Sequence, residues 1–111
     1  MIDGTSSDYW KLGVMVFAEM VYQKHYSDFH AELVAFVGRT FSNVQSGLQG
    51  DSWVWILDGG EKVAIDTFTS MKHQIKSPKA GVHVQSVIEA LRRQFQLKVY
   101  EQPELEAHED A

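Results

Sequence analysis

The chain has 111 residues, a formal net charge of −5 and 44% hydrophobic residues, which suits one folded domain and excludes a wholly disordered chain. It has no cysteine, so disulfides and thiolate metal sites are excluded, and a reducing compartment is the simpler expectation. The first nine residues lack the basic region of a signal peptide, and the apolar run Val14–Ala18 is too short to cross a bilayer. We therefore expect a cytoplasmic protein that does not act at a membrane.

Charge is distributed unevenly along the chain. Five of the fifteen acidic residues lie in the last eleven positions, so the rest of the chain is neutral overall. Residues 67–100 hold six basic residues and one acid. We predict a single α+β domain over residues 1–103, with residues 1–8 flexible, and a disordered acidic C-terminal tail over residues 104–111.

The first predicted element is a strand over residues 10–22. Apolar residues occupy every second position from Trp10 to Tyr22, which is typical of a strand buried on one face. A helix competes, because Val14, Phe17 and Val21 also match helical spacing. Gly13 and the valines favour the strand.

A helix should follow, with Ser27-Asp28 as its N-cap. Its apolar residues recur at helical spacing, and the turn-forming stretch Ser42–Asp51 predicts a loop after it. The apolar positions of this helix are Phe29, Leu33, Phe36, Val37 and Phe41.

The clearest pattern is a β-hairpin from Trp53 to Phe68. Both arms are rich in β-branched and aromatic residues, and the connector Asp58–Glu61 contains two glycines that tolerate positive φ. The second arm could continue toward Lys76. Ser77-Pro78 should end it, since proline offers no donor to a ladder.

A second helix and a last strand complete the chain. The helix is predicted by Val84, Val87, Ile88, Leu91 and Phe95 at helical spacing. The residues that follow, 97–101, indicate a short strand, which the proline at position 103 should end.

The order β-α-β-β-α-β predicts a ferredoxin-like (split βαβ) two-layer sandwich. In that fold, a four-stranded antiparallel sheet carries two helices on one face. The topology hosts many unrelated functions, so it predicts none of them.

Catalytic and metal signals are weak. The five histidines show no metal-ligand spacing, and no nucleophile elbow is present. His25 and His30 flank the first helix start and read as surface or capping residues. Asp66 is the one acid in an apolar strand, and we expect it to lie on the solvated face or to accept a turn hydrogen bond. We predict no catalytic residue, metal or cofactor.

A basic segment leads into the second helix and could bind a small anionic ligand. Helix N-termini favour anions, and glycine allows a close backbone approach. The candidate residues are Lys72, His73, Lys76, Lys79, Gly81 and His83.

Nucleic-acid binding is not expected, although the RNA-recognition module shares the predicted strand order. That module carries stacking aromatics in a defined motif on its third strand. The corresponding arm, Lys62–Phe68, lacks the motif, and Asp66 would repel phosphate.

The sheet face opposite the helices is the second candidate site. Met15 and Phe17 are expected there, together with either Trp53 and Trp55 or Val54 and Ile56. Apolar patches of this kind mark interfaces. We expect an interaction or regulatory module that acts through this face as a homodimer or with a protein partner; the alternative is an anionic-ligand binder or simple enzyme with a pocket near residues 72–83.

Overall fold

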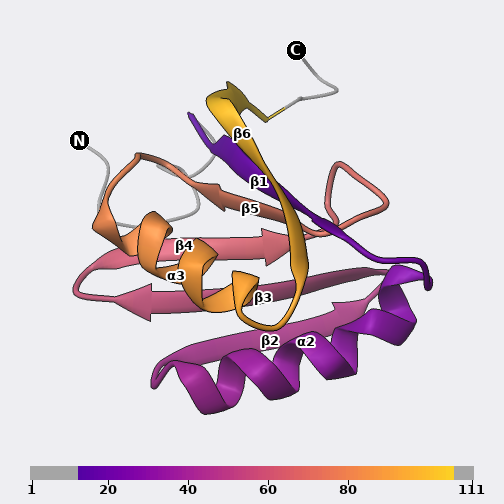
Figure 1. The fold of residues 1–111 in the computed structure, drawn as a ribbon. Coiled ribbons are helices and arrows are strands. Elements are labelled where there is room, and N and C mark those ends of the chain that lie inside the picture. Colours follow the sequence, from indigo (N-terminus) through magenta and orange to yellow (C-terminus); the bar gives the residue numbers. More distant parts are fainter. Residues whose placement is uncertain (1–12, 107–111) are drawn as a thin grey trace.

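The computed structural model describes residues 13–106, which form a six-stranded antiparallel sheet and two helices (Figure 1). The strands lie in the order β2-β3-β4-β5-β1-β6. The elements in chain order are β1 (Met15–Val21), α2 (Tyr26–Thr40), β2 (Val44–Gln49), β3 (Asp51–Asp58), β4 (Glu61–Asp66), β5 (Gln74–Ser77), α3 (Val82–Arg92) and β6 (Gln96–Leu105). Within the described range, no helix has the length and apolar character needed to cross a membrane.

The protein belongs to the α+β class, but the predicted four-stranded ferredoxin-like sheet is wrong. Two strands were missed. β2 occupies most of the stretch 42–51 that was read as a loop, and β5 is a separate strand rather than the continuation of β4. The predicted hairpin itself is present, with Trp53 opposite Asp66 and Asp58 opposite Glu61, and both connector glycines have positive φ.

β2 forms although its sequence is polar, because β3 supplies a long pairing surface. Six residues of β2 pair with β3, from Val44 opposite Ile56 to Gln49 opposite Asp51. Gly50, with φ of 82°, allows the reversal between the two strands. The strand is therefore set by its neighbour rather than by its own apolar pattern.

The carboxylate of Asp66 helps to end β4. It accepts a hydrogen bond from the backbone N–H of Phe68 at 3.1 Å, which turns the chain away from the ladder. Residues 67–73 then form a loop before β5 begins. β5 pairs with both β4 and β1 and so joins the two halves of the sheet.

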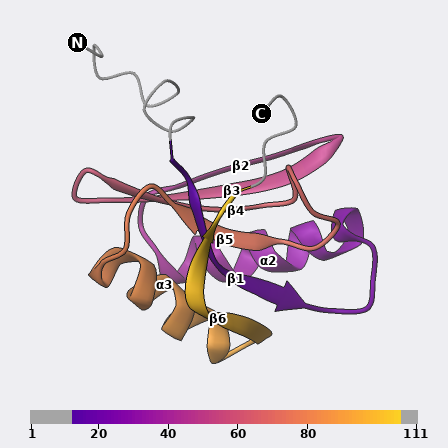
Figure 2. The same ribbon diagram turned by 90° about the horizontal axis from the view of Figure 1, so that it is seen from above.

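Both helices pack on one face of the sheet, which we call the inner face (Figure 2). One apolar cluster joins them to the sheet, because their apolar residues recur at helical spacing. The N-cap of α2 is His25, whose side chain accepts from Ser27 N–H, rather than the predicted Ser27-Asp28. The fully buried residues of the apolar cluster include Leu33, Val37, Val54, Ile65, Ile75 and Leu91.

A β-bulge in β1 changes which side chains enter the core. Val16 lies opposite Lys76 and Ala18 lies opposite Ile75, so the register shifts around Phe17. Phe17 and Ala18 both join the core cluster as a result. The strict alternation assumed from the sequence therefore fails in the middle of this strand.

β6 is longer than predicted and passes through Pro103. Proline is tolerated because β6 is the edge of the sheet. Glu104 and Leu105, assigned to the tail by the sequence, belong to this strand. The rest of the predicted tail, and the predicted flexible residues 1–8, lie outside the described residues.

Candidate functional site

The six residues of the predicted anion site do not converge on one surface. His73 points to the inner face and Lys76 to the opposite, outer face, and both are fully buried. Lys72 donates to Tyr22 O at 2.8 Å, and its ammonium lies 4.4 Å from the centre of the Tyr22 ring.

The remaining members of that set lie near the start of α3. Lys79 pairs with Glu61 at 3.0 Å. His83 Nε2 lies 3.0 Å from Ser77 Oγ. Gly81 is the N-cap of α3 and makes no side-chain cap. Neighbouring groups of this chain thus engage these basic side chains, and anion binding there stays a prediction.

The four predicted interface residues lie on two different faces. Val54 and Ile56 are buried under the helices, so Trp53 and Trp55 lie on the outer face. Phe17 is buried in the core and Met15 packs against it. The tryptophans therefore stand on the outer face without the two β1 residues.

Trp53 and Trp55 form an aromatic platform next to β2. Their ring centres are 4.6 Å apart at an angle of 43°. Lys62 places its ammonium 3.9 Å from the Trp55 ring centre, a cation–π contact. Trp53 lies over Gly47 of β2, where the lack of a Cβ leaves room for the indole. The platform thus reaches the edge of the sheet.

The backbone of β2 presents unpaired ladder groups at that edge. Leu57 donates to Asn43 O at 3.0 Å, so these two residues form a hydrogen-bonded pair. Along an antiparallel ladder, hydrogen-bonded pairs alternate with pairs that are not hydrogen-bonded to each other. Gln45 and Gly47 therefore bond to β3, whereas every second residue points its N–H and C=O away from β3. Within residues 13–106, no strand lies on that side. The outward residues are Val44, Ser46 and Leu48.

The opposite edge, β6, differs from β2 in charge, in proline content and in the regularity of its pairing. It carries Lys98, Glu101 and Glu104, and Pro103 offers no donor. Four of its residues, 100–103, face the single bulged residue of β1, because the register jumps there. Charge, proline and bulges are devices that block edge pairing. β2 has no charged residue and no proline.

A chain of buried and part-buried hydrogen bonds on the inner face links residues next to β1 and β5, the start of β3, and the first turns of α2. The Tyr22 hydroxyl lies 2.7 Å from His73 Nδ1, and His73 Nε2 lies 2.7 Å from Ser52 Oγ. Ser52 Oγ is in turn 2.6 Å from Nδ1 of His30 on α2. One direction of donation satisfies all four groups: Tyr22 to His73, His73 to Ser52, and Ser52 to His30.

Burial keeps this chain neutral. It lowers the pKa of His73 to about 4, raises the pKa of Tyr22 to about 12, and lowers the pKa of His30. A serine beside an imidazole is the arrangement of a nucleophile and its base. However, Ser52 and His73 are both 0% exposed, so a substrate cannot reach the hydroxyl. The network holds the N-terminus of α2 against β1, β3 and β5.

A second buried network lies on the outer face. Lys76 is 1% exposed and pairs with Asp66 at 2.6 Å and with Glu106. Burial raises the pKa of Asp66, and Lys76 opposes this effect. A solvated position for Asp66 is therefore wrong, because it too is 1% exposed. The alternative expectation, that Asp66 accepts a turn hydrogen bond, is confirmed by its bond from Phe68 N–H.

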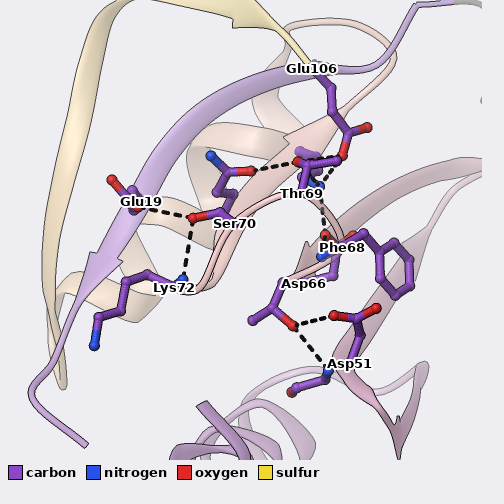
Figure 3. Close-up of polar contacts among 12 residues, drawn as sticks. Glu19, Asp51, Asp66, Phe68, Thr69, Ser70, Lys72 and Glu106 are labelled. Atoms are coloured by element: carbon purple, nitrogen blue, oxygen red, sulfur yellow. Dashed lines mark hydrogen bonds and ion pairs between the residues drawn. The ribbon is translucent and has the colours of Figure 1, made fainter. Parts of the chain in front are cut away.

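The loop 67–73 is held over the sheet by polar contacts (Figure 3). Thr69 reaches Glu106 at 3.1 Å, and Ser70 reaches Glu19 at 3.4 Å. These contacts tie the loop to β1 and to the end of β6.

A groove of about 240 Å³ lies between α3 and β6. Its walls are mainly apolar, from Phe17, Val84, Ile88, Val99 and Pro103. It lacks the convergent buried polar groups that fix a small ligand. Among residues 13–106, no three histidine or acidic side chains gather in a way that could hold a metal.

Sequence reasoning missed both buried networks. Their members are far apart in the chain, and the His73 chain joins residues separated by up to 51 positions. Two signals were present in the sequence: Asp66 as an acid within an apolar strand, and the basic and histidine residues of the segment 72–83, which was read as exposed. No family model, curated protein or solved structure matches the chain.

Proposed function

We propose that the protein is an interaction module that accepts an extended protein strand at the edge strand β2. The contrast between the two sheet edges carries this proposal. β6 has three charged residues, a proline and a bulge, whereas β2 has six uncharged residues without proline. Edges that must stay single are blocked by such devices, and an unblocked edge is a template for another strand.

The backbone supplies the binding chemistry. Every second residue of β2, from Val44 to Leu48, offers one donor and one acceptor in the direction away from β3. Strand addition takes its affinity from main-chain bonds of this kind and its specificity from alternate side chains.

The aromatic platform supports the same location. Trp53 and Trp55 lie on the outer face beside β2, and Gly47 leaves room for the indole of Trp53 to lie over this edge strand. A strand added to β2 would pass next to this ring. Tryptophan is enriched at interface hot spots because it buries a large area at low entropic cost. We also propose a cytoplasmic location, since the chain has no cysteine.

Titration with a probe strand tests the proposal. The protein is labelled with ¹⁵N and kept at a dilution at which sedimentation gives a 12.6 kDa monomer. The probe is a blocked hexapeptide of alternating threonine and valine. We expect amide shifts at Val44, Ser46 and Leu48 and at the Trp53 indole, with Gln45 and Gly47 less affected.

Ser46→Pro is the matched blocking variant. Its N–H points away from β3, so proline there removes an outward donor without breaking a bond to β3. Ser46→Ala keeps the N–H and should bind the probe as the native chain does. Probe shifts that persist in Ser46→Pro, or that fall on β6 instead, would contradict the proposal.

A further inference from the structure

Building on the proposed function, we infer that the strand accepted at β2 is β2 of a second copy of this chain. The two strands would run antiparallel about a two-fold axis that passes beside Ser46. The inference rests on self-complementarity. When two copies of β2 are placed antiparallel, the residues that point outward lie opposite one another, and so do the apolar side chains.

The hydrogen-bond phase restricts the possible registers. Only residues that point outward can bond to each other across the new ladder, so Val44, Ser46 and Leu48 must face outward residues of the second copy. The register that places Ser46 opposite Ser46 also places Val44 opposite Leu48 on both sides of the axis. It is the one register in which all three outward residues find partners within β2.

Side chains agree with this register on the inner face. Val44 is half-buried and Leu48 is 42% exposed, and both project to the helix-covered side. Pairing them across the axis brings together the two apolar side chains of β2. Ser46 meets Ser46, which introduces no charge.

The outer face agrees as well. Gln45 would lie opposite Gly47 of the second copy, and Gly47 is the position over which the Trp53 indole lies. The glutamine side chain would therefore lie beside the Trp53 indole, which occupies the outer face over Gly47. Gly47 thus serves both the indole of its own chain and the neighbouring strand.

Charge at the edge does not oppose the pairing. β2 carries no charge, so no like charges face each other across the axis.

Single-cysteine cross-linking tests the register, and the chain suits it because it has no native cysteine. Hydrogen-bonded antiparallel partners have Cα atoms about 5.5 Å apart, within disulfide range. Ser46→Cys should therefore give a covalent dimer under mild oxidation. The readout is the fraction of dimer on a non-reducing gel over time.

Gln45→Cys is the matched control, since residue 45 is as exposed as residue 46 and adjacent to it. In the proposed register the two copies of position 45 are diagonal neighbours, with Cα atoms roughly 7–8 Å apart, which is too far for a disulfide. We expect Ser46→Cys to cross-link at least tenfold faster than Gln45→Cys. Equal rates, a faster Gln45→Cys, or no cross-link in either variant would overturn the inference.

A second measurement separates this inference from the proposed function. Sedimentation of the native chain should approach twice 12.6 kDa as concentration rises, and Ser46→Pro should stay at 12.6 kDa. If the native chain stays monomeric while the probe peptide still shifts the β2 amides, self-pairing is wrong and the strand-accepting function stands. If the probe also fails, both are wrong.

Discussion

Gly47 on β2 lies directly beneath the indole of Trp53 on β3, so that a Cβ at position 47 would come within 2.6 Å of the ring. No ordinary packing contact is this short, so the ring occupies space that only glycine leaves free. Both residues lie on the outer face next to the sheet edge. The position of the Trp53 ring therefore depends on residue 47 having no side chain.

Gly47→Ala should therefore displace the Trp53 indole. Because the ring can move partly into solvent, the expected loss of unfolding free energy is at the low end for overpacking, about 1 kcal/mol. Urea unfolding followed by tryptophan fluorescence measures it, and the emission of the folded protein should shift to longer wavelength.

Gly38→Ala is the control for that variant. Gly38 is an exposed position of α2, and a Cβ there would meet nothing within 4 Å. Alanine in a helix is better than glycine by about 0.5–1 kcal/mol, so this variant should be more stable than the native chain. Equal effects of the two substitutions would show that steric contact at Gly47 is not the cause.

Lys76→Met should be the most destabilising of these substitutions. It leaves the buried Asp66 carboxyl without its ammonium partner, and breaking such a pair costs about 3–5 kcal/mol. Adding Asp66→Asn removes the more deeply buried of the two carboxylates that lose the ammonium and should recover part of the loss. A double variant that is as unstable as the sum of the two single variants would argue against coupling.

Acid should destabilise the fold through His73. Its pKa is about 4 in the folded protein and 6.5 when unfolded, so the unfolded state binds the proton first as pH falls. Stability from this residue is therefore fully present above pH 6.5 and is lost as pH falls from 6.5 toward 4. The difference amounts to about 3 kcal/mol.

Two measurements check that dependence. NMR titration of the His73 ring should give a midpoint well below that of an ordinary histidine. Urea unfolding should show a falling midpoint between pH 7 and pH 4.5. A His73 midpoint near pH 6.5 would refute the prediction.

The elements that could be predicted from the sequence are those with a strong periodic signal of their own. The β3–β4 hairpin combines alternating apolar residues with two glycines in its connector, and both helices carry an apolar stripe. These signals are local, so they can be recognised without knowledge of the tertiary fold.

β2 and β5 could not be predicted because their neighbours determine them. β2 offers only Val44 and Leu48 as apolar residues, and β5 is four residues long with the buried Lys76 at its centre. A lysine reads as a surface residue unless its carboxylate partners are known to lie beside it. Missing these two strands turned a six-stranded sheet into an expected four-stranded one.

Only part of the candidate site could be predicted from the sequence, for the same reason. The sequence singled out Trp53 and Trp55 but left open which face they take, because Val54 and Ile56 were equally suited to the core. The free edge beside them depends on β2, which was read as a loop. The basic segment 72–83 looked like a single surface, yet alternation along β5 sends His73 and Lys76 to opposite sides.

The blocked character of β6 limits how large an assembly can become. Two copies joined through β2 would form one continuous sheet whose two outer edges are both β6, with Pro103, its charges and its bulge. Growth would stop there, since a two-fold contact uses the one pairing edge of each copy. A sheet with two open edges would instead elongate into a fibre, so in such a dimer Pro103 would help to prevent the addition of further copies.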